Sequence, residues 1–218
     1  MPAIPPQAPR SRVPAPRPRK PKPRTRYHHG DLRRALLEET VRIIRDEGVA
    51  GLTLRTVGAR LGVSRTAMYR HFADKSALLA AVSRDGFTQL RVALQAAFDG
   101  GGRDREAFDA QGRAYVEFAI ANPSHYRVMF GGFVDKSCVD PALAAEADGA
   151  FQVLVDTLVE LQARGVLRQD EPRQLALFVW SLVHGLAMLV IDGQLQGRPA
   201  ADDLLGFTFR RMWSGLEA

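Results

Sequence analysis

Hydrophobic and polar positions recur at helical spacing along most of this 218-residue chain, from Tyr27 onward. The first apolar face is formed by Leu32, Leu36, Ile43 and Ile44, with charged residues on the opposite side. Gly48 is placed to end this helix, since glycine readily adopts the left-handed conformation found after helix C-termini. No stretch alternates with a period of two for long enough to make a sheet, so the pattern predicts an all-α fold.

Capping residues divide the next part of the chain into three further helices. Thr53, Ser64 and Asp74 each precede a helical pattern, and their side chains can accept a hydrogen bond from the backbone of the first turn. After three consecutive glycines at 100–102 the helical pattern resumes and continues toward the C-terminus. The expected helices cover residues 54–61, 65–72, 75–98, 104–121, 123–131, 141–164, 172–193 and 201–215.

The two short helices at 54–61 and 65–72 are joined by a tight turn at Gly62, which is the arrangement of a helix-turn-helix. Gly58 lies on the inward face of the first helix, where it lowers helix propensity, so we expect it to permit close approach of a neighbouring helix. Met68 and Phe72 are expected to face back into the same small core.

The second short helix carries side chains suited to DNA. In a helix-turn-helix, residues at the N-terminal end of the second helix reach base edges in the major groove. Here those residues are Arg65, Thr66 and Ala67, preceded by the capping Ser64. Arg can bond guanine through two hydrogen bonds, and the methyl groups of Thr and Ala can contact thymine. Donors suited to phosphates follow at Tyr69, Arg70, His71 and Lys75.

Positive charge is concentrated at the N-terminal end. The formal net charge is +6, with eight Lys or Arg and no Asp or Glu in residues 1–26, a net +3 in 27–73 and a net −5 in 74–218. This asymmetry indicates a polyanionic partner such as nucleic acid. The first 26 residues include nine Pro, so we expect a disordered arm. A solubilising tail, a mis-assigned start and an arm that lies along phosphates remain open interpretations.

Several other classes of protein lack support in the sequence. The single cysteine, Cys138, rules out an internal disulfide framework and fits a cytoplasmic compartment. His28 and His29 have no acidic or cysteine partner at ligand spacing, so we expect neither a metal ion nor a cofactor. We find no apolar run of the roughly 18 residues that cross a membrane. The Walker, His-Glu-x-x-His and Gly-x-Ser-x-Gly motifs are also missing, so we expect no enzyme.

The segment LTLRTVGARLGVSRTAMYRHFADKSALL closely resembles the N-terminal domain of the tetracycline-repressor (TetR) family of bacterial transcription regulators. The resemblance covers about Gly30 to Phe87, and it implies a double-stranded DNA operator bound by a homodimer. Repression is the commoner mode in the family. By position in the family motif, Thr53 and Arg55 match DNA contacts made from the second helix, whereas Gly58 replaces the usual Ala.

The C-terminal stretch WSLVHGLAMLVIDGQL resembles a subgroup of the family with a Trp…His-Gly element, here Trp180, His184 and Gly185. Beyond the basic arm at 1–26, which its composition predicts, the resemblance implies a DNA-binding domain at 27–89 and a ligand-binding and dimerisation domain at 90–218. Helices 172–193 and 201–215 have apolar faces too large to leave exposed on a soluble monomer. The resemblance implies that they pair with their twofold mates, and we expect Leu186 on the exposed part of this face.

The resemblance also implies a small-molecule effector that enters among the C-terminal helices. Six residues are candidates for its pocket: Phe118, Tyr126, Phe130, Phe151, Trp180 and His184. An aromatic stripe is more often core, and for His184 we favour a bond to a backbone carbonyl over contact with a ligand. An architectural DNA binder without a switch is the competing interpretation, but the long apolar helices exceed what a bare clamp needs.

Overall fold

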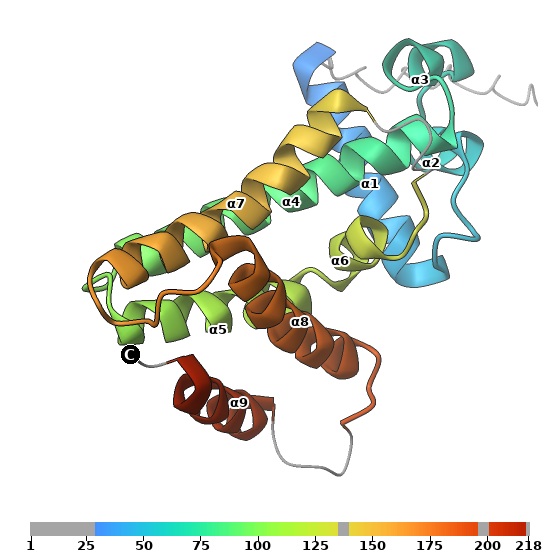
Figure 1. Ribbon diagram of the computed structural model, residues 1–218. Helices are drawn as coiled ribbons and strands as arrows, with labels where there is room; N and C mark the ends of the chain where they lie inside the picture. The colour runs from blue at the N-terminus through green and yellow to red at the C-terminus, as the bar shows by residue number, and fades with distance from the viewer. Residues whose placement is uncertain (1–28, 135–139, 196–200, 217–218) are drawn as a thin grey trace, which may run out of the picture.

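The computed structural model describes residues 29–134, 140–195 and 201–216, and within these ranges the chain is all-α, without a β-sheet (Figure 1). The helices are α1 (His29–Glu47), α2 (Leu54–Leu61), α3 (Arg65–His71), α4 (Lys75–Asp99), α5 (Arg105–Ala121), α6 (Pro123–Phe130), α7 (Pro141–Ala163), α8 (Pro172–Ile191) and α9 (Ala201–Leu216). The predicted fold class is confirmed, and the predicted helix ends differ from these by at most two residues. The predicted N-terminal arm and Cys138 lie outside the described residues.

The three predicted N-caps are confirmed, and they explain where α2, α3 and α4 begin. The side chains of Ser64 and Asp74 each accept a hydrogen bond from the backbone N–H three residues further on, at 3.2 Å and 2.8 Å. Thr53 and Thr56 form a reciprocal pair, in which the N–H of each donates to the hydroxyl of the other at 3.0 Å. The side chains therefore satisfy backbone donors that the first turns leave without partners.

Helices α1, α2 and α3 and the first half of α4 enclose a small hydrophobic core. Its deeply buried members include Leu36, Ile43, Leu52, Val57, Met68 and Leu78. A methyl group at Gly58 would lie 3.0 Å from Cγ of Met68, so the glycine does allow α3 to approach α2 closely. Gly62 has a left-handed φ of 65°, which turns the chain sharply between the two helices.

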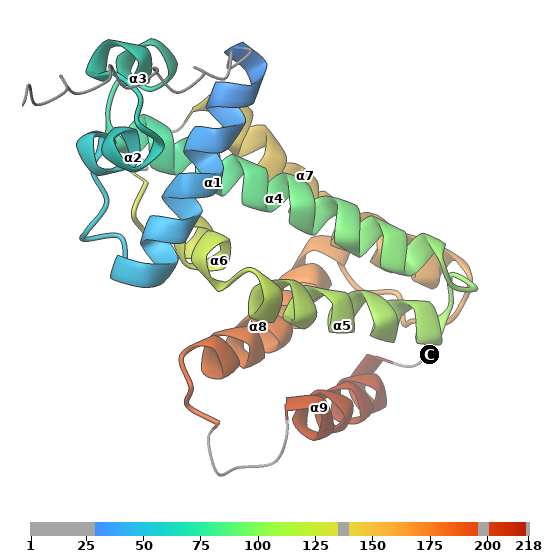
Figure 2. The ribbon, with the colours of Figure 1, turned by 180° about the vertical axis from the view of Figure 1, so that it is seen from behind.

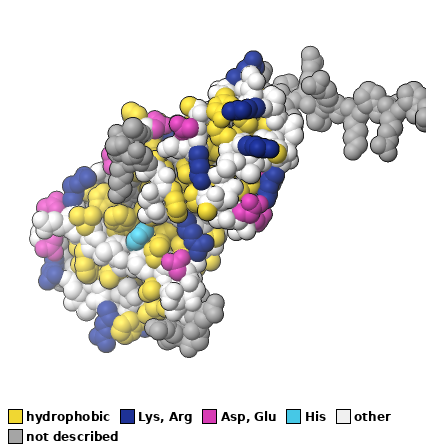
Figure 3. Space-filling view, turned by 90° about the vertical axis from the view of Figure 1, so that its right-hand side faces the viewer, with side chains coloured by type: hydrophobic (Ala, Val, Ile, Leu, Met, Phe, Trp, Pro, Cys, Tyr) yellow, Lys and Arg dark blue, Asp and Glu magenta, His cyan; other side chains and the backbone are white. Residues whose placement is uncertain are grey.

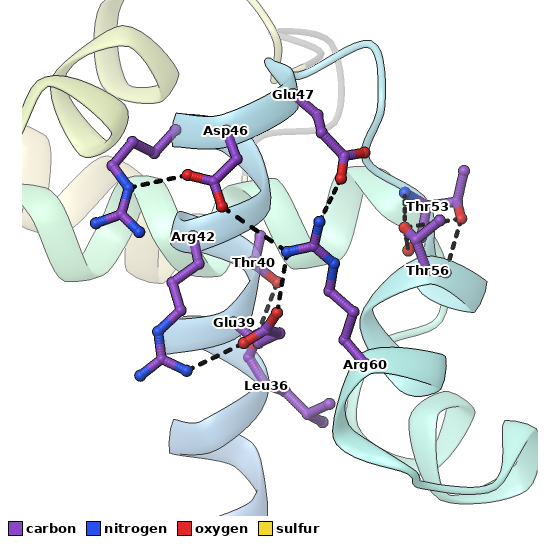
Figure 4. A network of polar contacts seen from close by, with 10 residues as sticks. Leu36, Glu39, Thr40, Arg42, Asp46, Glu47, Thr53, Thr56 and Arg60 are labelled. Atoms are coloured by element: carbon purple, nitrogen blue, oxygen red, sulfur yellow. Dashed lines mark hydrogen bonds and ion pairs between the residues drawn. The ribbon is translucent and has the colours of Figure 1, made fainter.

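A group of ion pairs joins α1 and α2. Figure 4 shows the Arg60 side chain reaching from α2 to carboxylates on α1. Arg60 bonds Glu39 at 3.4 Å and Glu47, and it lies 3.9 Å from Asp46. Glu39 is buried and also accepts a bond from Arg42 at 3.0 Å. The helix that braces α3 is therefore itself held against α1.

The remaining helices form a second, larger hydrophobic core. The long helix α4 belongs to both cores, because Val82 lies in the first, whereas Leu90 and Phe98 lie in the second. Helix α7 runs along α4, and α5 and α8 pack below them, with α9 on the outside of α8 (Figures 1 and 2). The helix-turn-helix thus sits at one end of α4 and the larger bundle at the other.

The apolar surface of α8 divides differently from our prediction. Leu175, Val179 and Leu186 are buried in the monomer core, whereas Phe178 and Leu189 are 47% and 44% exposed. The expectation that Leu186 is exposed is therefore wrong, because this helix is apolar on two faces. By length and composition alone α8 could cross a membrane, which corrects the statement that no segment is long enough, although a core helix can meet the same criterion.

Candidate nucleic-acid interface and ligand cavity

Helix α3 is divided into a buried face and an exposed basic face. Met68 is buried, and Phe72 directly after the helix is also buried, and both pack in the smaller core. The opposite face exposes Arg65, Thr66, Tyr69 and Arg70, with Ala67 and His71 partly buried at its edges. The capping Ser64 is exposed at the N-terminal end of this face. The arrangement places the predicted base-contacting residues at the surface, with a rigid core behind them.

The two most prominent side chains of this face lie against each other. The guanidinium carbon of Arg65 lies 5.5 Å from the centroid of the Tyr69 ring, and Tyr69 is 48% exposed. A cation over an aromatic face at this distance is attracted electrostatically. This contact limits the conformations of Arg65 while its N–H donors remain available to a partner.

The arginines of this region differ in whether a carboxylate neutralises them. In the described part of the chain, Arg55, Arg65 and Arg70 have no carboxylate partner, whereas Arg60 is surrounded by the carboxylates of α1. On the face of the molecule in Figure 3, Lys and Arg side chains gather over its upper part. The exposed arginines of α2 and α3 are therefore the groups suited to an anionic partner.

Two of the predicted DNA-binding residues also have structural roles. The hydroxyl of Thr53 is occupied in the cap of α2. Lys75 donates from Nζ to the backbone carbonyl of Val49 at 2.7 Å, which ties the loop after α1 to the start of α4. An ammonium group has three donors, so this bond leaves two for a phosphate. Lys75 is thus a positioned cation and not a freely moving one.

A cavity of about 310 Å³ lies within the larger core. Its walls are almost entirely apolar or aromatic, and residues from six helices contribute: Phe87, Leu90 and Leu94 of α4, Phe108, Gln111 and Tyr115 of α5, Phe130 of α6, Phe151 and Leu154 of α7, Trp180 and Val183 of α8, and Phe209 and Met212 of α9. The volume is at the lower end of the range for small-molecule sites. The cavity could hold a compact apolar ligand.

The six predicted ligand residues are distributed in three ways. Phe130, Phe151 and Trp180 line the cavity. Tyr126 and His184 are not part of the lining and belong to a polar cluster next to it. Phe118 is buried in the hydrophobic core and does not line the cavity. The aromatic stripe of α5 and α6 therefore serves partly as core, as the alternative interpretation held.

The polar cluster joins α5, α6 and α8 through a chain of hydrogen bonds. Trp180 donates from Nε1 to the Tyr115 hydroxyl at 2.9 Å, the Tyr115 and Tyr126 hydroxyls lie 3.0 Å apart, and Tyr126 Oη lies 2.7 Å from His184 Nδ1. Burial raises the pKa of Tyr115 to about 12, raises that of Tyr126 and lowers that of His184, so all three are neutral near pH 7. We assign the protons so that Tyr115 donates to Tyr126 and Tyr126 donates to His184. The Nδ1 atom of His184 is therefore bonded by tyrosine hydroxyl groups and not by the backbone carbonyl that we expected.

Sequence reasoning missed Gln111, which is 2% exposed and lines the cavity. A signal for it was present, because Gln111 lies three residues after Phe108 and four before Tyr115 on the inward face of α5. A polar residue at an apolar helical position is the exception that such a pattern can identify.

Helix α6 connects the cavity with the smaller core. Phe130 lines the cavity, while Val128 of the same helix is buried in the smaller core that α1 to α4 enclose. Met129 packs on Gly86 of α4, where a methyl group would lie 2.5 Å from its sulfur. His125 reaches Asp85 of α4 at 3.3 Å. A displacement of α6 would therefore change the shape of the cavity, the packing against α4 and the packing of the smaller core behind α3.

Comparison with known protein families agrees with this arrangement. Residues 36–82 match the model described as bacterial regulatory proteins, tetR family, and residues 108–212 match that of the tetracyclin repressor-like C-terminal domain. The chain belongs to the TetR family. Both matched families consist of transcription regulators and not enzymes, and this TetR-family protein is a DNA-binding transcription regulator.

Individual relatives of this TetR-family chain are similar over most of its length. An uncharacterized HTH-type transcriptional regulator of Mycobacterium tuberculosis is 28% identical over 214 residues, which cover 94% of this chain and 86% of the relative. A protein of unknown function from Rhodococcus sp. RHA1 is 32% identical, with a TM-score of 0.81 over 89% of this chain and 100% of that one. The TetR-family regulator PfmR of Thermus thermophilus, 21% identical, shares the fold, with a TM-score of 0.66 over 84% of this chain and 99% of its own.

Proposed function

We propose that this TetR-family regulator is a ligand-responsive repressor that binds a palindromic operator as a homodimer and is released by a small molecule. The observation that carries the proposal is the position of α6, which contributes Phe130 to the cavity and Val128 to the core behind the recognition helix. A bare DNA clamp needs no such connection. A protein that acts on chromosomal operators works in the cytoplasm.

For DNA binding, we assign base contacts to Arg65, Thr66 and Ala67 at the start of α3. Support comes from the exposed face of α3 and from the contact between Arg65 and Tyr69, which orders the guanidinium before DNA arrives. The capping Ser64, together with Thr53, Arg55, Tyr69, Arg70, His71 and Lys75, would position the phosphate backbone. The N-terminal arm would add contacts that depend on charge and not on base sequence.

For dimerisation, we assign the exposed apolar residues of α8 and α9 to the interface. Phe178, Leu189 and Phe207 are each 44–49% exposed, although they are large and apolar. Water contact with such side chains on two adjacent helices is unfavourable, and pairing with the same face of a second copy would remove it. The interface would thus use α8 and α9 at about 172–193 and 201–215, but with Phe178 and Leu189 and not Leu186.

For switching, we propose that a ligand in the cavity displaces α6 and α4 and changes the separation of the two recognition helices. The contact of α6 with α4 leaves little free space, since Met129 is packed on Gly86. Close-packed interfaces transmit a shift instead of absorbing it. A coupling free energy of about 1–3 kcal/mol would be enough for regulation.

Selection of bound fragments from random duplex DNA tests the proposal. A homodimer predicts an inverted repeat whose half-sites are centred one helical turn, or a multiple of it, apart. A selection without an enriched sequence, or with a single half-site and no symmetry, would contradict the operator-binding dimer.

A further inference from the structure

The amide oxygen of Gln111 is a buried acceptor without a partner. Gln111 is 2% exposed and lines the cavity, and its Oε1 is the one buried side-chain nitrogen or oxygen in the described residues that makes no hydrogen bond. Buried polar atoms are almost always paired, so an exception at a cavity wall indicates a group that is completed by something else.

The orientation of this amide follows from its other contacts. Gln111 Nε2 donates to the carbonyl of Leu94 at 3.3 Å and to the Thr157 hydroxyl at 3.0 Å. Thr157 donates its own proton to the carbonyl of Val153 at 2.9 Å, so it acts as an acceptor toward Gln111. Rotating the amide would bring its oxygen against the Leu94 carbonyl, and two acceptors would face each other. Both N–H donors are therefore used inside the protein, and the oxygen is the atom left for a ligand.

The tryptophan and tyrosine polar groups of the cavity lining already have hydrogen-bond partners. The indole N–H of Trp180 donates to the Tyr115 hydroxyl, and that hydroxyl lies 3.0 Å from Tyr126 Oη and 3.1 Å from His184 Nδ1. The lining contains no Lys, Arg or His, and its one charged residue is the exposed Asp148 of α7. A ligand carboxylate would find no cation and no free side-chain donor on these walls. A ligand with an O–H or N–H donor could donate a hydrogen bond to Gln111 Oε1.

We propose that the effector is an uncharged aromatic molecule that donates one buried hydrogen bond to Gln111 Oε1, as a phenol or an aromatic amine would. This inference rests on the proposal that the cavity is the effector site. The apolar walls bind the ring, and the acceptor selects the functional group that it carries. A site built to bond a donor rejects an analogue that lacks one, because its buried acceptor would then stay unpaired.

Calorimetry with three small probes tests this reading: 2-naphthol, 2-methylnaphthalene and 2-naphthoate. The ring is common to all three, and the substituent is a donor, a methyl group or an anion. The full-length protein should bind 2-naphthol about tenfold more tightly than 2-methylnaphthalene, which corresponds to about 1.4 kcal/mol, and should bind 2-naphthoate most weakly.

Gln111→Met retains the length and volume of the side chain but removes the acceptor. It should lose the preference for 2-naphthol while binding 2-methylnaphthalene at least as well as the wild type. Gln152→Met, on the exposed face of α7 outside the cavity lining, is the matched control and should keep the wild-type preference. Thermal unfolding checks that each variant is folded.

An equal preference for 2-naphthol in the wild type and in Gln111→Met would overturn the role of Gln111. Tighter binding of 2-naphthoate than of 2-naphthol, or no binding of any probe at millimolar concentration, would overturn the ligand class. Operator release is a separate measurement. If 2-naphthol binds through Gln111 and leaves operator affinity unchanged, the proposed switch fails for this ligand while the specificity of the cavity stands.

Discussion

Replacing Arg65 with Ala removes the residue that we place at a base edge, and its cost can be worked out from its surroundings. Arg65 is exposed, lacks a carboxylate partner in the described chain and contacts Tyr69 through its cationic face. A two-bond contact from Arg to guanine discriminates by about 1–3 kcal/mol. A homodimer presents Arg65 twice, so the binding free energy for the operator should fall by this amount at each half-site. Fold stability should change by less than about 1 kcal/mol, since only an exposed cation–π contact is lost.

Fluorescence anisotropy with the selected operator, with duplexes changed at single positions and with scrambled DNA measures both affinity and specificity. Arg65→Ala should weaken operator binding and relax the preference at one position in each half-site, while binding of scrambled DNA changes much less. Arg113→Ala, on the exposed face of α5, is the matched control and should bind as the wild type does. An Arg65→Ala variant with full affinity and an unchanged selected sequence would show that α3 does not read the operator in this way.

Three further predictions concern phosphate contact, dimerisation and acid stability. Lys75→Met should weaken operator and scrambled DNA alike and reduce the slope of log affinity against log salt by about 0.9 per half-site; an unchanged slope in a salt titration would remove Lys75 from the interface. Phe178→Asp should give a monomer by sedimentation and abolish operator binding. Val159→Asp, which changes an exposed valine of α7, is the control and should remain a dimer that binds the operator. A wild-type monomer at micromolar concentration would refute the interface. The hydrogen bond from His125 lowers the pKa of Asp85, so this carboxylate stabilises the fold above its unfolded-state pKa, and the contribution is lost as the pH falls through the lowered value. When the free energy of unfolding is measured with urea at several pH values, Asp85→Asn should therefore lose less of it in acid than the wild type does. Identical pH profiles for the two proteins would contradict the contact.

The helices were predictable because their signals are local. Thr53, Ser64 and Asp74 lie at the helix ends that they cap, and a cap depends on the three residues that follow it. Gly58 was predictable for the same reason, since a glycine on an inward face indicates close packing wherever the neighbouring helix comes from. The exposed face of α3 follows from its 3.6-residue period.

The cavity and the α8 surface were less predictable because they depend on several helices at once. The cluster of Tyr115, Tyr126 and His184 joins three helices, so spacing along the chain cannot reveal it. Leu186 and Phe178 are both apolar on one helix, and hydrophobicity does not distinguish a core contact from contact with a second copy. Gln111 was recognisable as an outlier in its helix, but only the tertiary contacts of its amide show which atom is left without a partner.

The linkage between the cavity and the operator is tested most directly by measuring the affinity of one cavity ligand with and without saturating operator DNA. The ligand is chosen as a compound that binds the wild type and loses affinity in Leu154→Trp, which fills the cavity. Coupling through α6 predicts that bound operator lowers the affinity for the ligand by about 5- to 150-fold, and that bound ligand lowers the affinity for the operator by the same factor. A ligand that binds the cavity with equal affinity in the presence and absence of operator would contradict a ligand-driven switch for that compound.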